Sequence, residues 1–199
     1  MAGIPCTFIR LAGCPLRCTY CDTTQAIPVD SGEWMAMGDI ISEVKQRGRP
    51  LVLVTGGEPL AQKQCVDLLK LLGEVDCTVQ LETSGAYSIA QVPDAVHRIV
   101  DIKTPASGEV ERNRLENLDL LTVNDELKFV VCDRKDYEWC RAFILEYGLE
   151  SSPATLLFSP GFGTVSASDL SAWILEDRLP VRMQVQLHKL IWGAEVTGV

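Results

Sequence analysis

The stretch Gly13-Cys14-Pro15-Leu16-Arg17-Cys18-Thr19-Tyr20-Cys21-Asp22-Thr23 carries the strongest chemical signal in the chain. It places three cysteines in the spacing C-x3-C-x2-C, and the next cysteine along the chain is Cys65. In electron-transfer proteins, four thiolates normally hold the irons of a [4Fe–4S] cluster. Three thiolates would leave one iron open to bind a further ligand. Because the stretch contains Pro15 and has no apolar stripe of helical spacing, we expect a loop that wraps around one compact group.

Two other interpretations of the three cysteines stay open at this point. Structural zinc takes four ligands, and only His97, His188 or a distant cysteine could supply the fourth. The cysteines could also be reduced, inert thiols, because short spacings alone do not separate a metal site from free thiols.

Length and composition predict an ordinary globular protein. The 199 residues fit one domain over residues 1–199, and 47% hydrophobic content is ample for a packed core. No segment approaches the ~20 apolar residues of a membrane span. The first residues lack the basic flank and apolar core of a signal peptide. We therefore expect a cytoplasmic protein without membrane contact.

The net charge bears on possible binding partners, and the number of cysteines bears on their chemical role. The net charge of −9 argues against nucleic acid, because neutralising phosphates needs clustered Lys and Arg. Eight cysteines in a chain without a secretion signal indicate thiols and metal ligands rather than a disulfide scaffold. The five outside the loop are scattered singly, and we assign them no role: Cys6, Cys65, Cys77, Cys132 and Cys140.

Apolar runs alternate with segments of helical periodicity along most of the chain. This alternation predicts a parallel sheet with helices packed outside it. About six β/α units fall short of the eight units and ~250 residues of a closed barrel, so we expect an α/β fold with an open, partial TIM-like barrel. Ligands of such sheets bind at the carboxyl ends of the strands. Strands are expected at residues 7–11, 51–54, 78–82, 96–103, 126–131, 155–159 and 183–187, and helices at 38–48, 62–72, 134–147 and 168–177.

A glycine-rich segment, Thr55-Gly56-Gly57-Glu58-Pro59, ends the second expected strand. Two consecutive glycines remove both Cβ atoms, so backbone can approach a ligand closely. Glu58 adds a carboxylate beside it. An ordinary Gly-rich turn is the alternative for this segment alone.

The cysteine spacing followed by Gly-Gly-Glu-Pro after the second strand resembles the radical S-adenosylmethionine (SAM) superfamily. The resemblance implies that Cys14, Cys18 and Cys21 hold a [4Fe–4S] cluster whose open iron chelates SAM. It also implies reductive cleavage of SAM to methionine and a 5′-deoxyadenosyl radical.

Five further segments are similar to the 7-carboxy-7-deazaguanine synthase family. The resemblance implies a SAM- and Mg²⁺-dependent ring contraction of 6-carboxy-5,6,7,8-tetrahydropterin to 7-carboxy-7-deazaguanine with loss of ammonia, and regeneration of SAM in each turnover. It also implies a homodimer and an electron donor such as flavodoxin or ferredoxin. The segments are Phe8–Gly13, Asp22-Thr23, Glu82–Gly85, Asp101–Pro105 and Gln184–Lys189.

The same resemblance implies roles for individual residues. The SAM contacts are Tyr20, Cys21, Asp22, Gly56, Gly57, Glu58, Asp101, Ile102 and Lys103. The substrate contacts are Arg10, Thr55 and His188, and a guanidinium at position 10 suits a carboxylate. Thr23 matches an Mg²⁺ ligand, which suits a hard cation. As alternatives, Arg10 could pair with a surface acid, Thr23 could cap a turn and His188 could be a core histidine.

One difference from the family pattern concerns the substrate pocket. Family members carry a strand and a Gln-Gly-Glu-Gly segment before the Phe-Ile-Arg-Leu strand, and the given sequence begins just past that place. We expect either a truncated start or a pterin pocket that closes differently.

Two competing functions stay open on the sequence alone. A glycyl-radical activase of the same superfamily would act on a partner protein and would not require Arg10 or Thr23. A zinc or iron–sulfur binding module would have no catalytic activity.

Overall fold

The computed structural model describes residues 1–194 and 196. In this part of the chain, seven strands form one sheet in the order β1-β2-β3-β4-β5-β6-β7, and each neighbouring pair is parallel. The expected α/β fold with an open barrel is therefore confirmed. The strands are β1 Cys6–Leu11, β2 Leu51–Gly56, β3 Thr78–Thr83, β4 His97–Ile102, β5 Glu126–Val131, β6 Thr155–Pro160 and β7 Arg182–Met183.

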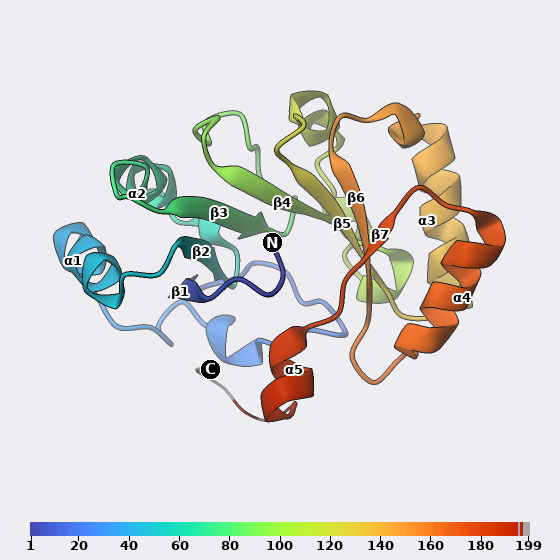
Figure 1. The fold of residues 1–199 in the computed structure, drawn as a ribbon, viewed down its shortest axis with the longest axis horizontal. Coiled ribbons are helices and arrows are strands. Elements are labelled where there is room, and N and C mark those ends of the chain that lie inside the picture. Colours follow the sequence, from blue (N-terminus) through green and yellow to red (C-terminus); the bar gives the residue numbers. More distant parts are fainter. Residues whose placement is uncertain (195, 197–199) are drawn as a thin grey trace.

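Helices α1 to α4 cover one face of the curved sheet, as Figure 1 shows. Their ends follow local signals. The side chain of Asp133 caps α3 by accepting from the Asp136 N–H, and that of Ser166 caps α4 by accepting from the Asp169 N–H. Gly48 ends α1 with a φ of 57°, a conformation that costs glycine little. The helices are α1 Met37–Arg47, α2 Cys65–Leu72, α3 Arg134–Glu146, α4 Ala167–Asp177 and α5 Leu187–Trp192.

The hydrophobic core lies between the sheet and the helices. Alternate residues of each strand enter it, as Val52 and Val54 do in β2 and Leu127 and Phe129 do in β5. Tyr137 of α3 belongs to the same core, has no exposed surface, and packs its ring edge-on against Phe158. The remaining residues of each strand face the inside of the open barrel, which carries the polar side chains described below.

Two parts of the chain differ from the predicted alternation. Between β4 and β5 the described chain forms short 3₁₀ turns instead of an α-helix: Pro105–Ser107, Val110–Arg112 and Leu115–Leu120. The expected strand over residues 183–187 is wrong, because β7 ends at Met183 and α5 begins at Leu187. After the Gln184 N–H bonds to Phe158 O at 2.9 Å, the chain leaves the sheet and its side chains turn toward the cysteine loop.

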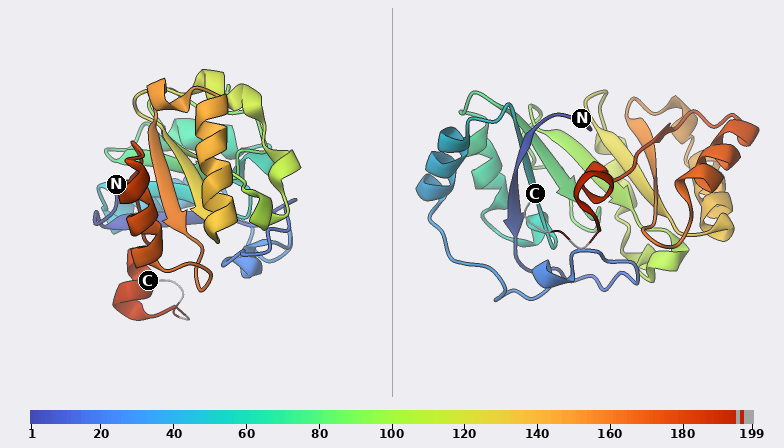
Figure 2. Two further views of the ribbon diagram at one scale, coloured as in Figure 1. Left: turned by 90° about the vertical axis from the view of Figure 1, so that its right-hand side faces the viewer. Right: turned by 60° about the horizontal axis from the view of Figure 1, so that its bottom comes forward.

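The edge strands β1 and β7 do not pair in the described residues, so the barrel stays open. Helix α5 lies between these two edges in both Figure 1 and the right-hand view of Figure 2. In the described part of the chain, none of the helices is long and apolar enough to cross a membrane.

Candidate active site

The loop that carries Cys14, Cys18 and Cys21 begins where β1 ends. Two backbone hydrogen bonds hold the first residues of this loop: the Gly13 N–H donates to Ala26 O at 2.8 Å, and the Cys14 N–H donates to Ile27 O at 3.0 Å. These two bonds close the loop on itself around the cysteines. All three cysteines are half-buried free thiols. Burial raises the pKa of Cys14 and of Cys18 above the usual thiol range.

The Gly-Gly-Glu-Pro segment holds the start of this loop. The Gly57 N–H donates to Leu11 O at 2.9 Å, and the Glu58 N–H donates to Gly13 O at 2.8 Å. A Cβ on Gly56 would lie 2.1 Å from Leu11 O, and one on Gly57 would lie 2.3 Å from Gly13 O. Both glycines are therefore required because the backbone of the cysteine loop occupies the space beside them. The sequence predicted close backbone approach, and the approaching group here is the loop itself.

Glu58 has a structural role that the sequence did not predict, and its expected cofactor contact stays a prediction. Its side chain is fully buried. Its carboxylate accepts from the Leu60 N–H at 2.8 Å, from the Thr83 hydroxyl at 2.8 Å and from the Ser84 N–H at 2.6 Å. Donors of the protein itself surround both oxygens, so we assign Glu58 to joining the ends of β2 and β3. Sequence reasoning missed this because Thr83 and Ser84 lie 25 and 26 residues further along the chain.

The other side of the cysteine loop is held by the segment after β4. The Thr19 N–H donates to Ser107 O at 3.0 Å, and the Arg17 guanidinium donates to Cys14 O at 2.7 Å.

Within the described residues, no three His, Cys, Asp or Glu side chains converge on one ion position. Thiolates of a [4Fe–4S] cluster each bind a different iron, whereas zinc ligands share one ion. Three thiols on one loop are compatible with a cluster.

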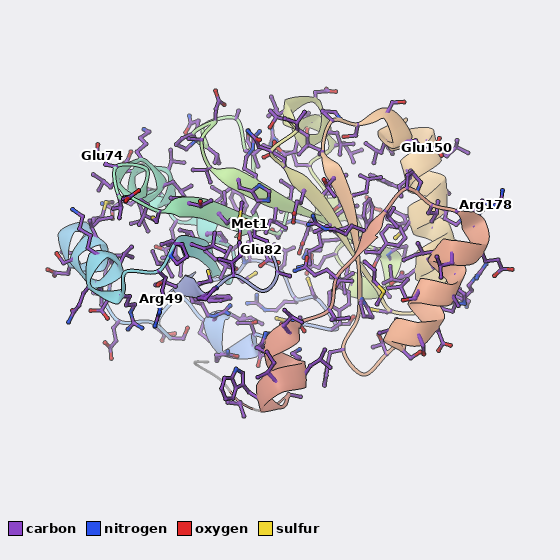
Figure 3. All side chains as sticks on the ribbon, viewed as in Figure 1. Met1, Arg49, Glu74, Glu82, Glu150 and Arg178 are labelled. Atoms are coloured by element: carbon purple, nitrogen blue, oxygen red, sulfur yellow. The ribbon has the colours of Figure 1, made fainter. Side chains whose placement is uncertain are left out.

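A chain of alternating charges lines the inside of the barrel beside the loop. The Lys103 ammonium lies 2.6 Å from Asp101 Oδ2, and the Lys128 ammonium lies 3.6 Å from Asp101 Oδ1 and bonds to Glu82. Burial alone would raise the pKa of Asp101, but Lys103 and Lys128 outweigh it and hold that pKa below its usual value. Figure 3 shows Glu82 near the centre of the view, whereas Glu74 lies at the periphery.

Two buried polar atoms at this place have no hydrogen-bond partner in the described protein. They are the hydroxyl of Tyr20 and Oδ1 of Asp101. Burial and the neighbouring Asp101 carboxylate raise the pKa of Tyr20, so its hydroxyl stays protonated and can donate. Asp101 Oδ1 is compensated by the Lys128 ammonium at 3.6 Å, whereas a buried hydroxyl without an acceptor is unfavourable unless a ligand accepts from it. This observation fits a polar cofactor bound between the cysteine loop and β4.

Of the three side chains of the Asp101-Ile102-Lys103 segment, that of Ile102 cannot reach a ligand inside the barrel. The side chain of Ile102 is 3% exposed and packs in the hydrophobic core behind the sheet, so only its backbone can reach a cofactor. The side chain of Ile102 faces the core because strand residues alternate between the two faces, so the expected SAM contact of this residue stays a prediction for its backbone. Asn113 fixes the segment by accepting from the Lys103 N–H at 2.7 Å and donating to Lys103 O at 2.8 Å.

The expected substrate residues Arg10 and Thr55 are register partners in β1 and β2. The Arg10 side chain is exposed, and its guanidinium donates to Gly56 O at 3.3 Å. Thr55 is buried. His188 is exposed on α5, and no contact places it beside these two residues. The structure thus brings Arg10 and Thr55 together at the edge of the sheet.

Asp22 and Thr23 follow Cys21 directly. The Thr23 hydroxyl donates to Asp22 Oδ1 at 3.1 Å, while Gln186 and Lys189 donate to Asp22 Oδ2 at 2.8 and 2.7 Å. Burial opposes ionisation of Asp22, but these donors outweigh it and lower its pKa to about 2. A hydroxyl beside a carboxylate is the type of oxygen donor that Mg²⁺ prefers.

Sequence reasoning missed several residues of this site. Lys128 interrupts the apolar strand β5, and that interruption was the available signal. Gln186 and Lys189 lie in the Gln184–Lys189 family segment, but the sequence did not predict their partner Asp22, which lies 164 and 167 residues away. Asn113 stands in a segment without regular periodicity.

Known proteins resemble this chain over almost its whole length. The family model described as the radical SAM superfamily matches residues 8–170. The chain is 44% identical to the 7-carboxy-7-deazaguanine synthase of Koribacter versatilis, over 99% of this chain and 92% of that protein. It is 43% identical to the 7-carboxy-7-deazaguanine synthase of Chlorobaculum tepidum, over 100% of this chain and 90% of that protein.

The chain belongs to the 7-carboxy-7-deazaguanine synthase family of the radical SAM superfamily. This membership confirms the expected family and the superfamily's cofactors, a [4Fe–4S] cluster and SAM. It also identifies the chain as an enzyme acting on a small molecule, and it argues against a glycyl-radical activase and a non-catalytic module.

Solved structures support the fold of this 7-carboxy-7-deazaguanine synthase family member. The chain superposes on Streptococcus suis SuiB with a TM-score of 0.62 at 11% identity, and on SuiB bound to S-adenosylmethionine with a TM-score of 0.61 at 11% identity. Both matches cover 91% of this chain but only 49% and 46% of those chains, so the shared part is about half of SuiB.

Proposed function

We propose that this chain converts 6-carboxy-5,6,7,8-tetrahydropterin to 7-carboxy-7-deazaguanine and ammonia in a SAM- and Mg²⁺-dependent ring contraction. The observation that carries the proposal is the similarity to enzymes named 7-carboxy-7-deazaguanine synthase over at least 90% of both chains. A match of that extent includes the cysteine loop, the inside of the barrel and the C-terminal segment together.

Cys14, Cys18 and Cys21 would hold the cluster. When bound, the cluster supplies the electron that cleaves SAM and so starts radical chemistry on the substrate. The chain's own part is to place the loop, which Gly56 and Gly57 do by letting its backbone pass close to the end of β2. Glu58 holds that turn in place through its buried hydrogen bonds.

SAM would bind between the cysteine loop and β4, with contacts from Tyr20, Cys21, Asp22, Gly57 and the Asp101–Lys103 segment. The buried Tyr20 hydroxyl, which lacks a hydrogen-bond partner in the described protein, supports this location, since a ligand acceptor would satisfy it. Lys103 is 7% exposed, and its ammonium compensates the charge of the Asp101 carboxylate. The part of the proposed SAM site that these two side chains form is therefore close to neutral.

Arg10, Thr55 and His188 would bind the substrate. The exposed guanidinium of Arg10 can bind a carboxylate through two parallel hydrogen bonds, which fixes both position and orientation. Thr55 stands directly opposite in β2 and adds a hydroxyl. Carboxylate anchoring at one end would hold the pterin ring still while a hydrogen atom is removed and later returned, with water excluded.

Thr23 would bind Mg²⁺. Its hydroxyl hydrogen is directed at Asp22, which leaves the oxygen lone pairs free for a cation. Thr23→Ala should therefore raise the Mg²⁺ concentration for half-maximal activity while leaving cluster content unchanged. An identical Mg²⁺ titration in the variant would overturn this assignment.

We further propose that the chain is one cytoplasmic domain that forms a homodimer, does not bind nucleic acid and receives electrons from flavodoxin or ferredoxin. Eight free thiols suit a reducing compartment. Exposed Leu190, Ile191 and Trp192 of α5 offer an apolar surface for a second copy. Sedimentation of the reconstituted protein tests the dimer, and a monomer at micromolar concentration would exclude it.

One anaerobic assay tests the activity. Reduced, reconstituted protein is incubated with SAM, Mg²⁺ and the carboxypterin, and the product is identified by mass. We expect many molecules of 7-carboxy-7-deazaguanine for each SAM consumed. Stoichiometric loss of SAM, or cleavage stimulated only by another protein, would favour a glycyl-radical activase instead.

A further inference from the structure

The C-terminal segment reaches back to the cysteine loop through one carboxylate. Gln186 Nε2 and Lys189 Nζ lie 2.8 and 2.7 Å from Oδ2 of Asp22, while Oδ1 accepts from the Thr23 hydroxyl. Asp22 stands between an expected cluster ligand and the expected Mg²⁺ ligand. The two donors come from the other end of the chain, 164 and 167 residues away.

These contacts join α5 and the residue before it to the cysteine loop. Helix α5 contains no buried residue in the described chain, and the side chains of Leu190 and Ile191 are 73% and 65% exposed. Lys189 is the exception, because its side chain is only 9% exposed and its ammonium lies 4.3 Å from the centre of the Phe162 ring. An ammonium held by both an aromatic face and a carboxylate has a defined position.

We propose that Gln186 and Lys189 are positioning residues for the cofactor loop. They hold the Asp22 carboxylate, and thereby the segment Tyr20–Thr23, in the conformation that receives SAM and Mg²⁺. The inference rests on the proposed function for its catalytic meaning, whereas the contacts themselves do not depend on it. The segment from Gln186 to Lys189 acts as a latch that joins the last part of the chain to the first.

The latch acts on Thr23 through a short relay. Lys189 and Gln186 occupy one oxygen of Asp22 and fix the rotation of its carboxylate. The other oxygen then accepts the hydroxyl hydrogen of Thr23, which leaves the hydroxyl lone pairs available to a cation. Lys189 also compensates the negative charge of Asp22 next to a loop that must carry three thiolates. Without the latch, both the orientation of the hydroxyl and this charge balance are lost.

The first test measures loop order in the protein before cluster assembly. Hydrogen exchange is followed in the peptide that contains residues 14–27, under anaerobic, reducing conditions, in the parent, Lys189→Met and Gln186→Leu. A hydrogen bond to a charged group stabilises by about 1.5 kcal/mol or more, so we expect exchange roughly tenfold faster in Lys189→Met. Gln186→Leu removes only the neutral donor and should show a smaller increase.

Two controls separate positioning from general destabilisation. Lys189→Arg keeps a cation at the same place and should restore slow exchange. Lys70→Met removes an exposed ammonium that lies 3.3 Å from Asp67 on α2, and it should leave the loop unchanged. Equal exchange in the parent and both latch variants would overturn the proposal. If Lys189→Met does not fold, Gln186→Leu and Lys189→Arg still decide it.

The second test uses the reconstituted enzyme. We expect Lys189→Met to raise the apparent KM for Mg²⁺ and for SAM by roughly tenfold, with a smaller change in kcat and full cluster content. Unchanged KM values would overturn the latch even if the enzyme makes 7-carboxy-7-deazaguanine. If no such product forms in the parent but hydrogen exchange still responds to Lys189, the proposed function fails and the positioning role stands.

Discussion

The carboxylate of Glu58 and the hydroxyl of Thr83 lie 2.8 Å apart at a fully buried position between the ends of β2 and β3. The same carboxylate accepts from the Ser84 N–H, so it joins the Gly-Gly-Glu-Pro segment to the Glu82–Gly85 segment. Because the backbone of Glu58 also bonds to Gly13, this one residue connects the cysteine loop to two strands. Glu58 therefore stabilises the packing of the cysteine loop against the ends of β2 and β3.

Glu58→Gln should destabilise the protein by about 2–4 kcal/mol. The substitution replaces one acceptor oxygen with an amide nitrogen, so at least one buried donor that now bonds to Glu58 would lose its acceptor. Chemical denaturation of the cluster-free protein measures this loss. Glu74→Gln is the matched control, since Glu74 is exposed at the periphery (Figure 3). A change below about 0.5 kcal/mol at Glu58 would contradict the role assigned to it.

Gly57→Ala should prevent the cysteine loop from packing on β2, because the added Cβ would lie 2.3 Å from Gly13 O. We expect loss of cluster uptake in reconstitution together with a lower unfolding temperature. Gly38→Ala is the control: the space around its Cβ is open in α1, where alanine is favoured by about 1 kcal/mol over glycine. The two substitutions should thus act in opposite directions, and similar behaviour of both would contradict the explanation.

Replacing Cys14, Cys18 or Cys21 with alanine should abolish the brown colour and the electron paramagnetic resonance signal of the reduced cluster. Cys65→Ala should leave the signal intact, because Cys65 is 2% exposed in the core on α2. In the parent protein the signal should shift when SAM is added. A colourless protein that contains zinc would refute the cluster assignment.

Arg10→Ala should reduce product formation from the carboxypterin while slow SAM cleavage without substrate continues. Loss of a two-pronged charged contact costs roughly 2–5 kcal/mol, by analogy with buried charge pairs. Steady-state kinetics should show the loss in kcat/KM for the pterin, and Arg10→Lys should recover only part of it because an ammonium cannot form the paired contact. Equal loss of uncoupled SAM cleavage would place Arg10 in another role.

Glu126 should make stability depend on pH on the acidic side. Burial alone would raise its pKa, but the His97 imidazole 3.5 Å from the carboxylate, together with the hydrogen bond and charge of Arg182, lowers that pKa to about 2. The unfolded value is about 4.3. A depressed folded pKa means that the stabilisation is present above the unfolded value and is lost as pH falls from about 4 toward 2.

The acid limb can be measured by urea denaturation of the cluster-free protein between pH 2 and 7. In Glu126→Gln the loss of stability toward low pH should be smaller than in the parent, because position 126 no longer binds a proton. Parallel curves for the two proteins would show that Glu126 does not contribute.

Local patterns in the sequence were sufficient for the architecture. Continuous aliphatic residues predicted β2, helical periodicity with caps predicted α1 to α4, and the order of elements predicted a parallel, open barrel. These features depend on neighbours along the chain and on burial of one face, which a single sequence displays directly. The cysteine spacing and the Gly-Gly-Glu-Pro segment together predicted the superfamily for the same reason, because each is a short local pattern.

The partners of individual polar side chains depended on the tertiary structure. Glu58, expected to contact a cofactor, bonds to Thr83 and Ser84, and the expected last strand became β7 and α5 with Asp22 as a partner. A carboxylate binds whichever donors the fold brings within about 3 Å, and those donors come from segments with no fixed spacing in the sequence. The sequence therefore determined where β1 to β6 lie, and only the folded chain determined the end of β7 and which side chains meet at the strand ends.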